Sequence, residues 1–482
     1  MARPATSRAT EAVVSATSDL QAYALPNPYG TNELRARRYT QTLGLRVFDL
    51  LDQDPGGPQL VFTTRLRLDP DFGQGGGERD PSQLDGYVPG LEEAPLDLMY
   101  GYLDASSLLG GWLGLRVGRQ YLADALGWWS FDGARTTIST SLPLGFELYG
   151  GFEQRGGLPL LSTSRFTADG VFRGSRRDLE VNQWPSYLEE EKPAPAYGFA
   201  IETVHTDWLF ARIGYRRVTN RDVVYVTPFP TRPDTFEVYR EGRVSSERIG
   251  GSATLSHARL GSVGGSAVYD FLNHRWTEHG ASVTWFAAQP VTFTASYDYY
   301  LPTFDGDSIF NWFEHDGMTT GTLETDWVLS RRLEVAASVG ARRFLAEGFA
   351  ESADEASQPA AEPARSADAL GSANGRYRWQ RGSADLQLLG EAGSDGHRVG
   401  ADAAFRRTFS EGLYDTLLSL SLYDWADDAR PERDATSFTY VLGGGLHPGD
   451  QSRVGIEWEH TTNRLVGQRF RLFATLEWEV WL

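Results

Sequence analysis

Apolar and polar residues alternate along the last segment of the chain, 469–482. Its even positions are mostly apolar, as at Phe470 and Trp478, and its odd positions are mostly polar, as at Arg469 and Glu477. Alternation with a period of two gives a β-strand one apolar and one polar face. An ordinary globular strand has about 5–6 residues, whereas a tilted strand that crosses a bilayer needs about 9–11. The segment therefore predicts a membrane-crossing strand; the alternative is the closing strand of a soluble sandwich or lectin-like β domain.

The same alternation recurs through the chain, for example in 209–216 and 333–339. Segments with strand character lie near 39–51, 58–69, 96–104, 112–121, 132–141, 144–154, 195–206, 208–218, 235–256, 261–273, 278–288, 290–300, 316–329, 331–344, 375–390, 397–409, 411–424, 435–446, 450–460 and 468–482. Boundaries read from a pattern are good to about two to four residues. The chain is therefore predicted to be all-β.

The connections between these segments fall into two classes. Some are very short, as at 141–143, 289–290 and 410–412, and others are long and polar, as at 70–95 and 155–194. Short turns on one rim and long loops on the other are typical of bacterial outer-membrane barrels, which have an even number of strands. Three predicted strands lie between 331 and 411, and five before Leu142, where an even number is required in each region. One assignment in each region must therefore be wrong.

We predict a single transmembrane antiparallel β-barrel of about 18 strands, within the range 16–20, spanning residues 39–482. Residues 1–38 are rich in Ala, Ser, Thr and Pro and are predicted to be a flexible N-terminal leader. That leader has no apolar core of 7–15 residues and so contains no signal peptide. A protein of the bacterial outer membrane with this sequence would be a processed form, or its start would be misassigned.

Composition excludes several other classes. No run of 18 apolar residues occurs, which excludes transmembrane helices, and an aromatic content of 12% suits the interfacial girdles of a barrel. The absence of Cys excludes disulfide scaffolds, thiolate metal sites and cysteine nucleophiles. A net charge of −19 argues against nucleic-acid binding. The eight His are scattered, and no HExxH, GxSxG or GxxxxGK[ST] motif occurs. We therefore expect no enzyme activity, no cofactor and no metal site.

The segment 114–138 carries three short motifs: one ends a predicted strand, one lies in a loop, and one opens the next predicted strand. They are Gly118-Arg119-Gln120, Trp128-Trp129 and Phe131-Asp132-Gly133. The segment resembles the alginate-export family of outer-membrane barrels and related porin-like proteins, in which similar elements occur at similar spacing. The resemblance covers about 25 residues. We expect Arg119 and Asp132 to pair at the barrel rim; the alternative is that they only stabilise a loop.

Arginines recur on the polar faces of the predicted strands. These pore-lining candidates are Arg65, Arg67, Arg116, Arg212, Arg216, Arg342, Arg406, Arg469 and Arg471. Arginine rings favour anions through their field and through bidentate hydrogen bonds to carboxylate or phosphate. The resemblance indicates the same preference for anions, because it implies an arginine-rich lumen that conducts an anionic uronate polymer. The alternative is a lattice in which arginines pair with Asp and Glu and hold neighbouring strands together.

Tryptophans near predicted strand ends, such as Trp208, Trp285, Trp312, Trp327 and Trp425, are expected to sit at the membrane interface; carbohydrate stacking is the alternative. The chain end resembles the C-terminal signal of outer-membrane barrels that the barrel assembly machinery reads. Its residues are Trp478, Val480, Trp481 and Leu482.

We therefore expect an outer-membrane channel for an anionic saccharide, polysaccharide or similar small anionic solute. Its other partners would be outer-membrane lipid and the assembly machinery. A different class stays open, namely a structural barrel that sheathes or docks a periplasmic or envelope protein, for example in a secretion or electron-transfer assembly.

Overall fold

The protein is described by a computed structural model that covers residues 11–26, 33–50, 57–68, 96–153, 194–223, 241–288, 290–302, 317–345, 367–394, 396–428, 430–465 and 467–482. Its strands are β1 (Glu11–Pro26), β2 (Glu33–Phe48), β3 (Gln59–Leu68), β4 (Leu96–Ser107), β5 (Leu113–Asp124), β6 (Gly127–Ser139), β7 (Leu144–Glu153), β8 (Ala194–Thr203), β9 (Leu209–Val223), β10 (Glu241–His257), β11 (Gly261–Asp270), β12 (Arg275–Ala288), β13 (Val291–Tyr300), β14 (Gly317–Val328), β15 (Leu333–Leu345), β16 (Ala367–Trp379), β17 (Gly382–Gly393), β18 (Gly396–Phe409), β19 (Tyr414–Asp427), β20 (Ala435–Gly449), β21 (Ser452–Asn463) and β22 (Gly467–Trp481). Among these residues, helical structure is limited to the turn α1 (Leu108–Gly111) and the 3₁₀ turns η4 (Ser410–Gly412) and η5 (Pro431–Arg433). Within the same ranges, no helix has the length and apolar character needed to span a membrane.

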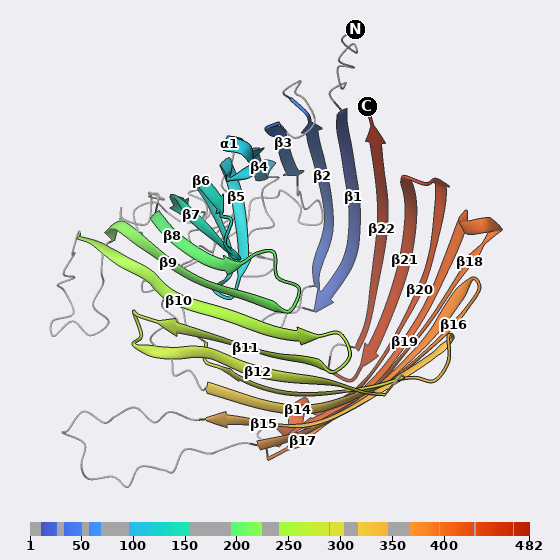
Figure 1. Ribbon diagram of the computed structural model, residues 1–482. Helices are drawn as coiled ribbons and strands as arrows, with labels where there is room; N and C mark the ends of the chain where they lie inside the picture. Colours follow the sequence, from blue (N-terminus) through green and yellow to red (C-terminus); the bar gives the residue numbers. More distant parts are fainter. Residues whose placement is uncertain are drawn as a thin grey trace, which may run out of the picture.

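The 22 strands form one antiparallel sheet that closes on itself. Each strand pairs with the next one in the chain, and β22 pairs with β1, with Val13 opposite Trp481 and Tyr23 opposite Arg471. Figure 1 shows β1 and β22 side by side, with the start of β1 and the end of β22 on the same rim. A closed sheet satisfies the backbone N–H and C=O groups of every strand and leaves no open edge.

The predicted strand number of about 18 is wrong, because two strands escaped the sequence pattern. β1 lies within the supposed leader 1–38, where most side chains are small and the alternation of Ala16 and Leu20 with Thr17 and Asp19 is weak. β16 and β17 are two strands joined by a two-residue turn at 380–381, where one strand over 375–390 was predicted. Each omission lies in a region where the predicted number was odd, and the barrel therefore begins at Glu11 rather than at residue 39.

The predicted division between the rims is confirmed. On the rim where β1 begins and β22 ends, connections such as 140–143, 329–332 and 410–413 are short. The long connections 69–95, 154–193 and 346–366 join strands at the opposite rim and lie outside the described residues. The short-turn rim and the long-loop rim are named in this sense below.

The two faces of the wall differ in chemistry. Along β19, Leu418, Leu420 and Leu422 are exposed on the outer face, while Ser419 and Ser421 face the lumen. At the chain end, Trp478 and Val480 have outer-face positions. Trp481 has an inner-face position, where it stacks on Phe48 with ring centroids 6.2 Å apart. An apolar exterior around a polar interior is the arrangement of a transmembrane barrel. Whether the four C-terminal residues act as an assembly signal stays a prediction.

Arginine introduced at neighbouring positions near the middle of β22 tests the register. Leu476 is exposed on the outer face, whereas Thr475 faces the lumen and donates a hydrogen bond to Asp19 at 3.1 Å. We expect Leu476→Arg to impair assembly, because a charge at the midplane of the lipid face costs about 2–4 kcal/mol. Thr475→Arg should be tolerated next to Asp19. Heat-modifiable migration of membrane fractions measures the folded share, and equal damage from both changes would show that the faces are reversed.

Candidate permeation pathway

The structure places all nine predicted arginines at inner-face positions. The assignment follows from the register, because residues directly opposite each other in neighbouring strands share a face. Arg65 lies opposite Gly44, Arg116 opposite Asp104, and Arg471 opposite Glu459. The complete set is Arg65, Arg67, Arg116, Arg212, Arg216, Arg342, Arg406, Arg469 and Arg471.

Several of these arginines pair with carboxylates on neighbouring strands. Arg116 pairs with Asp104. On the far side of the ring, Arg342 lies 3.3 Å from Asp368, and the guanidinium of Arg406 lies 3.7 Å from Asp385. For these residues the lattice alternative describes the structure, because the pairs join adjacent strands and cancel much of each other's field.

The inner positions of β22 and β1–β3 form an arginine seam with a different balance. It contains six arginines and four carboxylates: Arg38, Arg46, Arg65, Arg67, Arg469 and Arg471, with Glu11, Asp19, Glu477 and Glu479. Within the described ranges, Arg46, Arg65 and Arg469 form no ion pair. Arg65 donates to the hydroxyl of Thr42 at 2.9 Å, and the guanidinium of Arg46 lies over the ring of Phe48. The seam therefore keeps uncancelled positive charge.

Carboxylates dominate the wall about halfway around the barrel from this seam. On the inner face, β13 carries Asp298 and β14 carries Glu324 and Asp326, and neither strand contains an arginine or lysine. Among the described residues these three carboxylates form no ion pair. The lumen thus has a basic side at β22–β3 and an acidic side at β13–β14.

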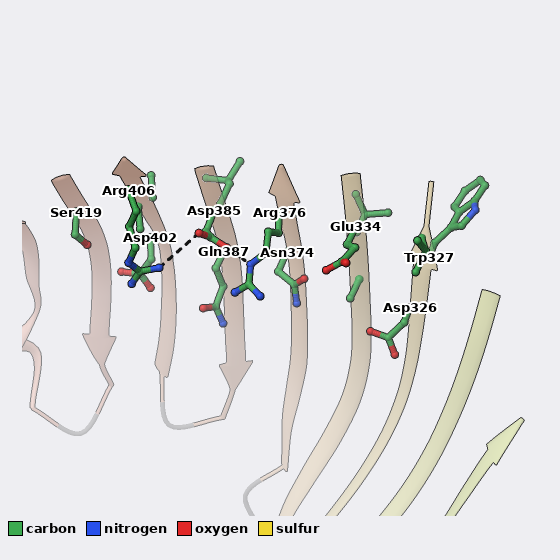
Figure 2. Close-up of a pocket in the computed structure, with 17 residues that line it drawn as sticks. Asp326, Trp327, Glu334, Asn374, Arg376, Asp385, Gln387, Asp402, Arg406 and Ser419 are labelled. Atoms are coloured by element: carbon green, nitrogen blue, oxygen red, sulfur yellow. Dashed lines mark hydrogen bonds and ion pairs between the residues drawn. The ribbon is translucent and has the colours of Figure 1, made fainter. Parts of the chain in front are cut away.

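A concavity of about 480 Å³ lies on the inner wall next to the acidic side, and Figure 2 shows the side chains that line it. Asp326 and Glu334 line it, and Asp385 lies between Arg376 and Arg406, both of which it pairs with. Trp327 points away from the other labelled residues. The concavity combines both charges with amide and hydroxyl groups, so it is a polar part of the pathway without a single dominant sign.

The most distinctive feature of the lumen is a hairpin that leaves the barrel wall. β5 and β6 pair with each other from Leu113 opposite Ile138 to Asp124 opposite Gly127. The strands on either side of this pair follow it over a shorter length. β4 pairs with β5 only as far as Arg119, and β7 pairs with β6 only as far as Phe131. Residues 120–130 therefore form a two-stranded hairpin that pairs with no other strand in the described part of the chain, called the lumen hairpin below.

The motifs that carry the family resemblance form the hinge of this hairpin. Gly118 has a φ of 129°, and a Cβ at this position would overlap the carbonyl oxygen of Gly101. A Cβ on Gly133 would likewise overlap the carbonyl oxygen of Gly150. Directly beyond the two glycines, the Nε and Nη2 of Arg119 lie 2.7 and 2.8 Å from the two carboxylate oxygens of Asp132. The expected pair of Arg119 and Asp132 forms, and it joins β5 to β6 at the base of the lumen hairpin.

The lumen hairpin folds inward and packs on the inner wall of β7–β9. Trp129 stacks on Phe131 with ring centroids 4.4 Å apart, and both rings contact Tyr149 of β7. Leu122, Val218 and Gln120 of the same region are also buried. Because Tyr149 and Val218 have inner-face positions, this is a hydrophobic core inside the barrel. The alternating pattern of the strands gave no indication of it.

Two of the predicted pore arginines hold the hairpin in place. Arg216 is buried, donates to the carbonyl oxygen of Leu126 at 2.7 Å and lies 5.1 Å from the ring of Trp129. Arg212 reaches Glu147 at 2.9 Å and Asp124 of the hairpin at 3.7 Å. Their inner-face position was predicted, but their side chains serve the packing of the hairpin, and Arg216 is covered by it.

The tryptophans predicted for the interface take several positions. Trp285 and Trp327 lie on the outer face near the short-turn rim, as expected for an interfacial girdle. Trp425 has an inner-face position and donates to the carbonyl oxygen of Arg433 at 3.0 Å. Trp312 lies outside the described residues.

Comparisons with known proteins identify no family for the chain. No family model and no curated protein matches the chain, so the resemblance to the alginate-export family stays a prediction. Among solved structures, the chain is similar to Acinetobacter baumannii OccAB4 at 7% identity, covering 100% of both chains, with a TM-score of 0.45. For the P pilus usher PapC translocation pore the values are 8% identity, 97% and 99% coverage and a TM-score of 0.44. For Pseudomonas aeruginosa OpdK with vanillate the identity is 10%, the coverage is 98% of this chain and 99% of the other, and the TM-score is 0.40. Similarity at this level assigns neither a family nor a cargo to the chain.

The hinge glycines are expected to tolerate no side chain. Gly133→Ala should lower the free energy of unfolding by about 1–3 kcal/mol, because its Cβ meets the backbone of the facing strand. Gly390→Ala is the matched control, since Gly390 is a strand glycine with no atom within 4 Å of its Cβ position. Urea titrations of the refolded barrel in detergent measure both, and equal midpoints would contradict the close approach at the hinge.

Proposed function

We propose that the protein is a channel of the bacterial outer membrane through which anionic solutes pass along the arginine seam. The closed sheet, its apolar outer face and its polar lumen support the membrane location, because a barrel of this kind is stable in lipid without any open edge. Outer-membrane lipid and the barrel assembly machinery are then its partners.

The observation that carries the proposal is the uneven distribution of charge around the lumen. Among the described residues, Arg46, Arg65 and Arg469 of the seam have no carboxylate partner, and Asp298 and Asp326 on the opposite side have no cationic one. An anion is attracted to β22–β3 and repelled from β13–β14. Guanidinium groups also bind carboxylate or phosphate through paired hydrogen bonds.

We propose more specifically that the anionic solute is a saccharide or polysaccharide. Its supports are the seam itself and the resemblance of 114–138 to the alginate-export family. The alternative, a barrel that sheathes a periplasmic or envelope partner, differs in one measurable respect: a barrel sealed around a partner conducts little current.

Conductance in a planar lipid bilayer separates the channel from the sheath. The purified barrel, reconstituted at 1 M KCl, should give ohmic steps of current. A bilayer that stays silent while the same sample shows heat-modifiable, folded protein on a gel would exclude an open channel and favour the sheath.

Removal of one unpaired seam arginine should shift the selectivity toward cations. One uncancelled charge about 9 Å away in water stabilises an anion and destabilises a cation by about 0.5 kcal/mol each, so Arg65→Ala or Arg469→Ala should lower the anion-to-cation permeability ratio about fivefold at low salt. Reversal potentials in a KCl gradient measure this ratio, and the shift should shrink at 1 M salt because of screening. Arg65→Lys keeps the charge and is the control. Unchanged reversal potentials in both alanine variants would remove the physical case for anion passage along the seam.

A further inference from the structure

Four aromatic side chains form a continuous row on the lumen side of β4 and the lumen hairpin. The ring centroids of Trp128 and Tyr121 are 6.2 Å apart, those of Tyr121 and Tyr100 5.9 Å, and those of Tyr100 and Tyr102 6.1 Å. Trp128 and Tyr121 belong to the lumen hairpin, and Tyr100 and Tyr102 belong to β4. The row therefore crosses from the wall onto the folded hairpin, and it is called the aromatic track below.

The inward fold of the hairpin explains why these rings face the lumen. The side of the hairpin that carries Leu122, Trp129 and Phe131 is buried against the inner wall. Trp128 and Tyr121 alternate with those residues and therefore point away from the wall, with 69% and 45% of their surface exposed. Large aromatic side chains exposed in a polar lumen contribute little to folding, and an exposed apolar surface of this kind typically marks a binding site.

Arginines flank the track. In register, Arg65 of β3 lies directly opposite Tyr100, and its hydrogen-bond partner among the described residues is the hydroxyl of Thr42. The guanidinium of Arg116 lies 4.4 Å from the ring centre of Tyr102, but it is paired with Asp104. Arg65 is therefore the cation beside the track that remains available to an anionic group.

We propose that the aromatic track binds an acidic oligosaccharide, with the apolar faces of successive sugar rings on Trp128, Tyr121 and Tyr100 and a carboxylate on Arg65. A sugar ring offers a flat C–H face and polar edges, which suits aromatic faces in a wet lumen. A carboxylate on the ring suits a guanidinium that has no ion-pair partner. The inference rests on the proposed channel function and adds to it a route along β3–β6 and the residues that recognise the cargo.

Block of the channel current by defined oligosaccharides tests the track. Tetragalacturonate and the neutral maltotetraose should both reduce the current through the unaltered barrel, and the acidic chain should do so at lower concentration. Trp128→Ala should raise the half-blocking concentration of both by about three- to tenfold, the range expected for losing one ring-stacking contact. Trp128→Phe should retain most of the block. Trp112→Ala is the matched control, because Trp112 is exposed outside the track, beside α1 on the short-turn rim.

Arg65→Gln separates charge from stacking. It should weaken block by tetragalacturonate and leave block by maltotetraose unchanged. A current that persists, with block by both oligosaccharides unaffected by Trp128→Ala, would overturn the track while leaving the channel in place.

A barrel that conducts no current would overturn the channel, and binding then decides the track separately. Tryptophan fluorescence of the detergent-solubilised barrel, titrated with tetragalacturonate, should change in the unaltered protein and not in Trp128→Ala. Such a change supports the track even without a pore, and its absence overturns the track.

Discussion

Closure of the sheet is the constraint on which the rest of the structure depends. In lipid, an unpaired backbone N–H or C=O costs several kcal/mol, and only a sheet whose first strand meets its last avoids that cost along a whole edge. The pairing of β1 with β22 supplies this closure, with Leu20 opposite Ala474 on the outer face and Asp19 opposite Thr475 on the inner face. Once the wall is closed, alternation gives every strand one face for lipid and one for water. The lumen chemistry follows from which residues occupy the second face.

The lumen hairpin is a local exception to closure, and its surroundings compensate for it. Residues 120–130 give up strand neighbours, and the side of the hairpin that carries Leu122 and Trp129 is buried instead against the inner wall. Gly118 and Gly133 permit the bend, while the buried guanidinium of Arg216 bonds a hairpin carbonyl and stacks near Trp129. A buried cation is costly unless it is paired or hydrogen-bonded. The hairpin that buries Arg216 also supplies a carbonyl oxygen that accepts its hydrogen bond. The fold thus converts part of its wall into an element that shapes the interior.

The sequence predicted the class of fold well, because alternation of apolar and polar residues is a direct consequence of a wall between lipid and water. It also predicted which arginines face inward, since register and face are linked by a period of two. It failed where the faces have little contrast: in β1, where Ala and Ser alternate with Thr, and at the two-residue turn between β16 and β17. The lumen hairpin could not be foreseen, because a hairpin that folds over the wall keeps the same alternation. Only the glycines next to Arg119 and Asp132 marked its hinge, and their meaning depends on the backbone that each approaches.

The seam that closes the barrel also sets the order in which it can assemble. Every other strand pair joins neighbours along the chain, but the hydrogen bond from Thr475 to Asp19 spans 456 residues. By loop-closure entropy alone, joining ends so far apart costs about 5 kcal/mol, and this contact can form only after β22 has been made. Until then the chain is an open sheet of up to 21 strands with the edge of β1 unpaired. An exposed edge is a template for strands of other chains. A stalled or truncated chain is therefore expected to aggregate through β1, so protection of the first strand is a requirement for biogenesis.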